Sequence, residues 1–122
     1  MLYEDLFKKA QIGKYVYVSD GNTQIGHVSV ICNITKYSVI GYSEGAGYEN
    51  LACMTSDIIF IEDCKKVNLL DLTKGDKIVI ETKEGIFANI FTKFEGNTLL
   101  LNYNLYYSKP IKNIYKIPEF FI

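Results

Sequence analysis

The sequence predicts an all-β protein made of two small, bent β-barrels in tandem, preceded by a short helix. Three observations carry this prediction. A strand that starts at a glycine occurs twice, as GKYVYV from residue 13 and as GDKIVI from residue 75, an offset of 62 residues. An acid–Gly turn follows each copy, at Asp20–Gly21 and at Glu84–Gly85, and an isoleucine-rich strand closes each. A near-fixed offset of this size indicates two supersecondary units. One continuous bent sheet is the alternative.

The predicted organisation has four parts. Residues 1–12 hold the helix, residues 13–64 the first module, residues 65–74 a bridge, and residues 75–122 the second module. The chain is 48% hydrophobic and 14% aromatic, which suits a globular domain rich in strands. A module of this size alone buries only about 60% of its unfolded surface. We therefore expect the modules to pack on each other or the chain to oligomerise.

The first module is expected to follow a helix over residues 2–10, where Leu2, Leu6 and Ala10 form one stripe. Its strands are expected at 15–19, 24–33, 37–42 and 58–61. Alternation in residues 24–33 places Val28, Val30 and Cys32 on one face and His27, Ser29 and Ile31 on the other. The glycine-rich segment 41–50 is interpreted as a loop, either the tip of a hairpin or a clamp for a ligand.

The second module is expected to repeat this plan, with strands at 77–82, 86–94, 98–107 and 114–117. In the second of these strands, Phe87 and Phe91 point to one face, and Ile86 and Ala88 point to the other. Both faces are partly apolar, which predicts a sheet covered on two sides. The bridge contains Val67, Leu70 and Leu72, and we therefore expect it to pack against the rest of the protein instead of forming a free linker.

The charge balance argues against a binder of duplex nucleic acid. The net charge is −1, and all 13 basic residues are lysines. Arginine is the usual side chain for bidentate contacts with phosphate and guanine, and clustered cations drive duplex affinity. The neutral, arginine-free composition therefore favours other partners.

The cysteines predict a reducing compartment. Cys32, Cys53 and Cys64 are odd in number and form no Cys-x-x-Cys pair, whereas a short secreted domain usually has an even set. We expect free thiols in a cytoplasmic protein. The sequence shows neither a signal peptide nor an apolar run long enough to span a membrane.

The stretch from Gly13 to Tyr42 resembles the first half of PRC-barrel domains. The matching positions are Gly13, Lys14, Val16, Val18, Asp20, Gly21, Ile25, Gly26, Val28 and Val39. The second module departs from the pattern, with Phe87–Ala88 where Ile25–Gly26 stands, and is equally similar to a strand-turn-strand unit of an Sm-like or SH3-like barrel. The resemblance implies a small adaptor or assembly module without a shared catalytic residue, so it assigns no functional residue here.

Neither catalysis nor metal binding is predicted, and no cofactor is expected. The only histidine is His27, and nothing nearby marks a nucleophile or an acid–base pair. A Cys₃His zinc site made of His27, Cys32, Cys53 and Cys64 would lack the usual short Cys-x₂₋₄-Cys knuckle. His27 and Cys32 are also an odd number of residues apart, which places them on opposite faces of a strand.

The ten tyrosines are the best functional signal, because tyrosine offers a large contact area and a polar tip at low entropic cost. Six of them are expected near strand ends and loops: Tyr42, Tyr48, Tyr103, Tyr106, Tyr107 and Tyr115. The first five are the candidate residues for binding a ligand or partner. The apolar C-terminus, Phe120, Phe121 and Ile122, is the candidate oligomer contact.

The preferred function is a non-enzymatic binding or assembly module that self-associates through strand edges and tyrosines and recruits a protein partner. A first alternative is an Sm-like regulator that binds RNA or single strands by tyrosine stacking, with Lys74, Lys77, Lys83 and Lys93 contacting phosphates. A second alternative is a small-molecule binder, for a nucleotide-like ligand held between modules or subunits, encoded by a mobile element.

Overall fold

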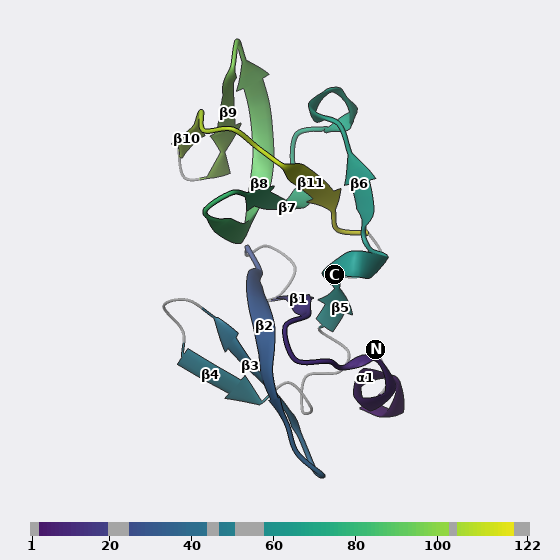
Figure 1. The fold of residues 1–122 in the computed structure, drawn as a ribbon. Helices are drawn as coiled ribbons and strands as arrows, with labels where there is room; N and C mark the ends of the chain where they lie inside the picture. Colours follow the sequence, from purple (N-terminus) through teal and green to yellow (C-terminus); the bar gives the residue numbers. More distant parts are fainter. Residues whose placement is uncertain (1–2, 20–24, 44–46, 51–57, 103–104, 119–122) are drawn as a thin grey trace.

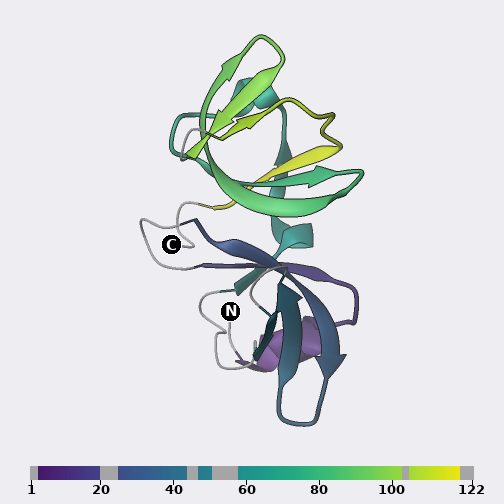
Figure 2. The ribbon, with the colours of Figure 1, turned by 90° about the vertical axis from the view of Figure 1, so that its left-hand side faces the viewer.

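The structure is a computed structural model, which describes the 122-residue chain except residues 1–2, 20–24, 44–46, 51–57, 103–104 and 119–122. Two antiparallel β-sheets are stacked one above the other, and helix α1 (Tyr3–Lys9) lies beside the first sheet (Figures 1 and 2). The mostly β composition with one short N-terminal helix agrees with the sequence prediction. Within the described residues, no helix is long and apolar enough to cross a membrane.

Each sheet is built from consecutive strands of the chain. The first has the order β4-β3-β2-β1-β5 and contains β1 (Tyr15–Val18), β2 (His27–Ile34), β3 (Val39–Ser43), β4 (Gly47–Asn50) and β5 (Ile58–Phe60). Two short 3₁₀ helices follow it, η2 (Ile61–Asp63) and η3 (Leu69–Asp71). The second has the order β10-β9-β8-β7-β11-β6 and contains β6 (Lys65–Val67), β7 (Lys77–Thr82), β8 (Gly85–Glu95), β9 (Thr98–Leu101), β10 (Tyr106–Tyr107) and β11 (Asn113–Lys116).

The two sheets have the same topology. Strands β1 to β5 correspond to β7, β8, β9, β10 and β11 in that order, and β6 is an additional strand at one edge of the second sheet. Neither sheet is closed by the described strands, so the observed architecture is two open antiparallel sheets. The internal repeat predicted from the sequence is therefore present at the level of strand order.

Each module begins in the same way. Gly13 and Gly75 have φ of 95° and 96°, a left-handed conformation that favours glycine. The amide of Gly13 donates to the carbonyl of Ile31 at 2.8 Å, and the amide of Gly75 donates to the carbonyl of Phe91 at 2.8 Å. A β-bulge follows directly in each case, after Ile31 in β2 and after Phe91 in β8. Because a bulge bends its strand, both sheets curl around their own core.

Each curled sheet encloses an apolar core. In the first module, the side chains of Val16 and Val18 of β1 are fully buried beside Leu6 of α1. In the second module, Ile78 and Ile80 of β7 occupy the corresponding positions. The first core also contains Ile31, Val39, Ile58 and Phe60, and the second also contains Phe91, Leu99, Leu101 and Ile114. Alternate residues of β1 and of β7 thus form part of the inward side of each sheet.

Residues 65–74 pack on the second module. Strand β6 pairs with β11, with Val67 opposite Ile114. Val67 and Leu72 pack against the second core as the sequence predicts, together with Leu69, whereas Leu70 is 91% exposed. Leu72 lies 62 residues after Ala10, which packs on the first core beside α1. A short helix therefore covers the core at the start of each module.

The predicted segment boundaries need two corrections. Segment 41–50 is not one loop, because Gly41–Ser43 belongs to β3, Gly47–Asn50 forms β4, and the register sets Tyr42 opposite Tyr48. Three glycines within residues 41–47 favour a loop locally, but the backbone pairing of β3 with β4 overrides that preference. The single strand predicted over 98–107 is two strands, β9 and β10, which pair with each other. Residues 44–46, between β3 and β4, lie outside the described residues.

Strand β8 is covered on both faces, as the alternation in its sequence predicts. Phe87 and Phe91 belong to the second core. Ile86 and Ala88 point the other way and pack in a third apolar cluster between the two sheets. This strand therefore links the interior of the second module to the junction with the first.

Candidate binding sites at the junction of the modules

The two modules meet through a shared apolar cluster, here called the junction core. Its buried members are Tyr17, Ile61, Cys64, Val79 and Ile117, and Val28, Ile59, Ile86, Ala88 and Tyr115 pack against them. The cluster draws on β1, β2 and β5 from one side and on β7, β8 and β11 from the other. It makes the two sheets one packed body, which removes the instability expected of each small module alone.

The junction core is formed by equivalent faces of the two modules. Tyr17 lies between Val28 and Ile59 in the register of the first sheet. Val79 lies between Ala88 and Tyr115 in the register of the second. Ile61 and Ile117 follow β5 and β11 at the same place. When one patch meets its own counterpart, the interface is isologous, as in a two-fold dimer. The chain is thus arranged like a homodimer of modules joined covalently.

At one pair of equivalent positions in this interface, the first module has a tyrosine beside a glycine and the second has a valine beside an isoleucine. The amide of Gly26 donates to the Tyr17 hydroxyl at 3.2 Å, and a Cβ built on Gly26 would lie 2.4 Å from the Tyr17 ring and from the Val18 carbonyl oxygen. In the second module the corresponding residues are Ile86 and Val79, both packed in the junction core. The first module therefore combines one large side chain, Tyr17, with a glycine that has none. The second module fills the equivalent space with two side chains of intermediate size.

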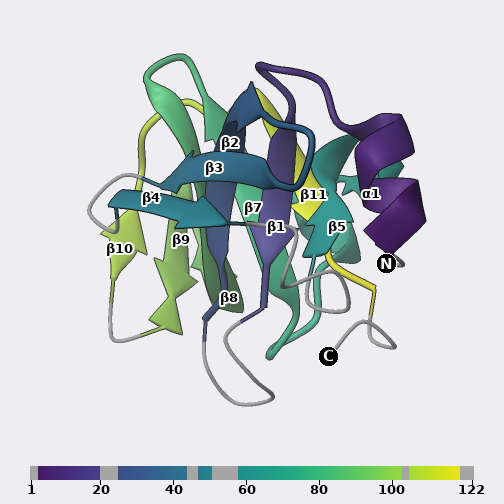
Figure 3. The same ribbon diagram turned by 90° about the horizontal axis from the view of Figure 1, so that it is seen from below.

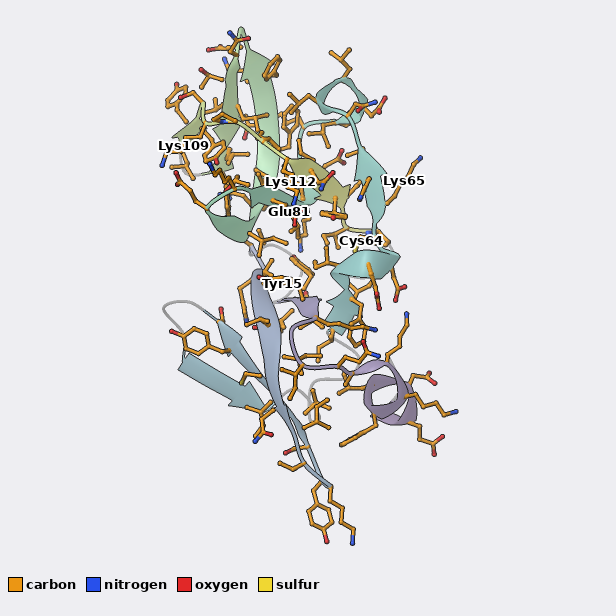
Figure 4. All side chains as sticks on the ribbon, viewed as in Figure 1. Tyr15, Cys64, Lys65, Glu81, Lys109 and Lys112 are labelled. Carbon is orange, nitrogen blue, oxygen red and sulfur yellow. The ribbon has the colours of Figure 1, made fainter. Side chains whose placement is uncertain are left out.

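A cleft of about 210 Å³ opens beside the junction core, here called the junction cleft. Its lining residues come from both modules: Lys14, Tyr15, Ile61, Glu62, Glu81, Ile86 and Tyr115. Lys14 Nζ lies 2.9 Å from Glu62 Oε1, so these two charges are paired. Figure 4 shows Tyr15 of the first module and Glu81 of the second facing the same junction.

Glu81 is the best-held acid of this cleft. Its Oε1 accepts hydrogen bonds from Asn113 Nδ2 at 2.7 Å and from the Tyr115 hydroxyl at 3.5 Å. Burial raises the pKa of Tyr115, and the negative charge of Glu81 and the hydrogen bond to it add to that rise. Tyr115 therefore stays a neutral donor, and the cleft combines two phenol rings with a carboxylate.

A second hollow, of about 280 Å³, lies at the equivalent place of the second module, and is here called the lysine pocket. It is lined by Thr73, Lys74, Gly75, Asp76, Lys77, Lys116, Ile117 and Pro118. The Asp76 Oδ2 accepts a hydrogen bond from the Thr73 amide at 2.8 Å, and its Oδ1 lies 3.7 Å from Lys116 Nζ. Among the described residues, three lysines and one carboxylate line this pocket.

Other hollows lie elsewhere on the described part of the chain. One of about 460 Å³ follows the edge strand β6 and has mixed charge from Lys66, Lys112 and Asp71. Another, of about 270 Å³, lies beside the junction core, where Gly26, His27 and Val28 face their equivalents Ile86, Phe87 and Ala88. The single histidine is therefore a residue at the interface of the modules.

The predicted tyrosines divide between the two sheet edges on one side of the molecule. Tyr42 of β3 is 44% exposed, and Tyr106 of β10 is 62% exposed. Tyr107 is half-buried and its ring centroid lies 5.4 Å from that of Phe87. Tyr48 is opposite Tyr42 in the backbone register, and Tyr103 lies outside the described residues. Strands β4 and β10 lie on the same side in two views (Figures 1 and 3).

The four lysines of the nucleic-acid alternative do not form one surface. Lys74 and Lys77 line the lysine pocket. Lys83 lies in the turn between β7 and β8, and Lys93 lies near the other end of β8, where its Nζ is 2.5 Å from Glu95 Oε1. The hydrogen bond to Glu95 and its charge raise the pKa of Lys93. The predicted oligomer contact, Phe120, Phe121 and Ile122, lies outside the described residues.

The cysteines occupy different environments. Cys64 is 7% exposed in the junction core, and its Sγ lies 3.6 Å from the Phe60 carbonyl oxygen. Burial, aided by the charge of Asp63, raises the pKa of the Cys64 thiol to about 11. Cys32 is half-buried, with its Sγ 3.5 Å from the Ile40 carbonyl oxygen, and Cys53 lies outside the described residues. The described residues contain no group of three side chains able to hold a metal ion.

Sequence reasoning missed Tyr15, Glu81 and Lys116, which line the two equivalent pockets, and it named Tyr115 only as one of the tyrosines near strand ends and loops. Aligning the two modules strand by strand would have found part of this signal, because Lys77 falls on Tyr15 and Lys116 falls on Phe60. Comparison with protein-family models, with curated proteins and with solved structures found no match to this chain.

Proposed function

We propose that this protein is a non-enzymatic binding and assembly module that self-associates through the outer strands of its two sheets. The observation that carries the proposal is the pair of sheet edges on one side of the molecule. Among the described strands, β4 pairs with β3 alone and β10 pairs with β9 alone. An exposed edge strand presents backbone donors and acceptors that can pair with another chain.

The tyrosines support the same proposal. Tyr106 is 62% exposed on β10, and Tyr42 is 44% exposed on β3, next to the other edge. Tyrosine is enriched at interfaces because its ring buries a large area while its hydroxyl finds a polar partner. Two such edges, fixed relative to each other by the junction core, would give a partner chain a bidentate surface.

We also propose that each module is a small bent barrel of the SH3-like kind, as the resemblance to PRC-barrels implies. Support comes from the strand order, from the bulge that bends β2 and β8, and from the single core inside each sheet. A fold of this kind is compatible with many functions, so the function rests on the edges and not on the fold.

The experiment is native mass spectrometry with light scattering across a protein dilution series. We expect the wild-type protein to form a multimer, and Tyr106→Lys to raise its dissociation constant about tenfold or more, because a lysine on an edge strand opposes pairing. The matched control is Tyr37→Lys, since Tyr37 is 75% exposed in the turn between β2 and β3, away from both edges.

The outcomes separate cleanly. A wild-type protein that stays monomeric at the highest concentration contradicts self-association. Equal effects of the two lysine variants would mean that general surface charge, and not the edge, controls assembly. An unchanged melting temperature of Tyr106→Lys shows that any loss of multimer is not caused by unfolding.

A small-molecule binder is the second candidate function, and the junction cleft favours it. The cleft lies between the two modules and presents Tyr15, Tyr115 and Glu81 in a volume of about 210 Å³. Small-ligand sites often lie between packed units and combine aromatic walls with a few polar groups. A discrete extra mass on the native protein would favour this candidate over assembly. The RNA-binding alternative has less support, because its four lysines are spread over different parts of the second module.

A further inference from the structure

The carboxylate of Glu81, in the junction cleft, is not balanced by a lysine. All 13 lysines of the chain belong to its described part, and the chain has no arginine. Among these described lysines, none forms an ion pair with Glu81. The Glu81 side chain is half-buried, and a partly desolvated charge is stabilised by an opposite charge or by hydrogen bonds. The chemistry of the cleft therefore depends on how this carboxylate is held.

One oxygen of this carboxylate is occupied and the other is open. Oε1 accepts the hydrogen bonds from Asn113 and from the Tyr115 hydroxyl, whereas Oε2 accepts none within the described part of the chain. The register explains the arrangement, because Asn113 lies opposite Glu81 and Tyr115 lies two residues further along β11, on the same face of the sheet. Two neutral donors thus fix the carboxylate in place, and Oε2 is available to a ligand.

The lysine that lines the cleft is held by the first module. Lys14 Nζ lies 2.9 Å from Glu62 Oε1 and donates a hydrogen bond to the Lys9 carbonyl oxygen at 3.0 Å. It also lies 5.5 Å from the centroid of the Phe60 ring. Lys14 and Glu62 therefore balance each other, and Glu81 is the charge without a counterpart among the described lining residues.

Two tyrosines from different modules share the cleft with this carboxylate. Tyr15 lies two residues before Tyr17 on β1, so alternation places both on the face that turns to the junction. Tyr15 is 43% exposed, and among the described residues its hydroxyl forms no hydrogen bond. The Tyr115 ring already attracts a cation, since Lys66 Nζ lies 5.9 Å from its centroid. Because the face of a tyrosine ring attracts positive charge, the rings and the carboxylate favour the same kind of ligand.

Comparison of the two modules shows that the shared fold does not require these side chains. In the strand registers, Glu81 corresponds to Ser19 of the first module, and Tyr115 corresponds to Ile59. The same strand order therefore forms without a carboxylate or a phenol at these two positions. A binding site would account for both differences, because both side chains line the same cleft.

We propose that the junction cleft binds the primary ammonium group of a small organic amine. The inference rests on the second candidate function, in which the cleft holds a small molecule, and it names the class of that molecule. An ammonium group carries three N–H donors, so it can bond to Glu81 Oε2 and to a tyrosine hydroxyl while it supplies the missing positive charge. The volume of about 210 Å³ leaves room for a short aliphatic chain beside Ile61 and Ile86.

The test is a titration of the full-length protein with butylammonium chloride, followed by amide shifts in a two-dimensional NMR spectrum. We expect saturable shifts at the residues that line the cleft, and no comparable shifts with sodium chloride at equal ionic strength. The neutral molecule n-butanol, which has the same chain, should bind more weakly because it lacks the charge.

Two variants locate the contact. Glu81→Gln keeps the shape of the side chain and should weaken butylammonium binding about tenfold or more, since the charge-assisted bond is lost. Its matched control is Glu84→Gln, which removes the same charge from the turn between β7 and β8, where the side chain is 74% exposed. Tyr15→Leu should weaken binding about threefold or more through the loss of its ring and hydroxyl.

Three results would overturn the proposal, and they separate it from the function on which it rests. If n-butanol binds as tightly as butylammonium, the cleft is a small-molecule site without preference for a cation. Equal weakening by Glu81→Gln and Glu84→Gln would indicate attraction to general surface charge. If neither probe gives saturable shifts, the cleft is not a small-molecule site at all. Because Glu81 is half-buried, its variant must first show a native spectrum, and Tyr15→Leu decides the matter if it does not.

Discussion

The two modules have one topology but cover their cores in different ways. In the first module, α1 brings Leu6 onto the core and Phe60 fills the end of β5, both at 0% exposure. In the second, Leu69 of η3 and Leu72, which directly follows η3, cover the core, and Lys116 takes the place of Phe60. The shared apolar positions specify the fold, and the positions that differ are free to carry chemistry.

The same comparison explains why the modules are joined. The two faces that form the junction core present equivalent apolar residues, and each face would be exposed to solvent if the modules separated. An isologous interface buries both faces at once. Cooperative unfolding of the two modules is therefore expected, with similar losses in the free energy of unfolding for equivalent substitutions in either module.

The largest effect is expected from truncating the equivalent isoleucines of the junction core. Ile61 is 5% exposed and Ile117 is 3% exposed. Ile61→Ala and Ile117→Ala should each lower the free energy of unfolding by about 2–5 kcal/mol, because a buried isoleucine loses contacts and leaves a cavity. Urea denaturation followed by circular dichroism measures both values, and Ile12→Ala is the control, since Ile12 is 69% exposed.

Similar losses for the two variants, with a single transition, would support an interface that depends equally on both modules. Two separate transitions, or a loss near zero for one variant, would show that one module folds without the junction core. In that case the description as a covalently joined dimer would be wrong.

A smaller loss of stability is expected from a substitution at the pair formed by Tyr17 and Gly26. Gly26→Ala should lower the free energy of unfolding by about 1–3 kcal/mol, since the added Cβ meets the Tyr17 ring and the Val18 carbonyl oxygen at 2.4 Å. Gly85→Ala is the matched control, because its Cβ would meet nothing within 4 Å. Thermal unfolding of both variants measures the difference.

The double variant Tyr17→Val with Gly26→Ala sharpens this comparison, because it imitates the smaller side chain at Val79. We expect it to recover part of the lost stability relative to the sum of the single variants, as coupled neighbours do in a double-mutant cycle. The remainder reflects the contact with the Val18 carbonyl. Strict additivity would show that the tyrosine and the glycine are not coupled.

Much of the fold follows from local signals in the sequence. The repeat of Gly13 at Gly75 is predictable because each glycine takes a left-handed φ at the start of a strand. The alternation of Phe87 and Ile86 correctly predicts two covered faces of β8, because side-chain direction in a strand has a period of two. Strand β4 was missed, since pairing with β3 decides its conformation and three glycines obscure the local pattern.

The candidate sites could not be predicted in the same way, because each depends on which elements meet. Lys77 and Lys116 are 39 positions apart and become neighbours only through the pairing of β7 with β11. Glu81 and Tyr15 line the same cleft only because the two modules pack together through the junction core. The tyrosine pattern predicts binding near strand ends and loops. The pockets are lined in part by lysines and acids, which cannot be told apart in the sequence from ordinary solvated residues.

The smallest effect concerns Cys64, which lies in the junction core where η2 leads from the first module into the second. Burial and the charge of Asp63 raise its pKa from 9.0 to about 11. Between these values the unfolded thiol loses its proton while the folded thiol keeps it, so the folded state binds more protons and stability falls as the pH rises. The pKa of Tyr115 is also raised, which acts in the same direction.

Cys64→Ala removes one of these two groups. The urea midpoint of the variant should therefore fall less steeply than that of the wild-type protein between pH 9 and about pH 11. The control is Ile12→Ala, which removes no titratable group and should follow the wild-type slope. Parallel curves for all three proteins would mean that the thiol is hydrated in the folded state. Because Cys64 contacts residues of both modules through the junction core, such a result would also argue for water between them and against a closely packed interface.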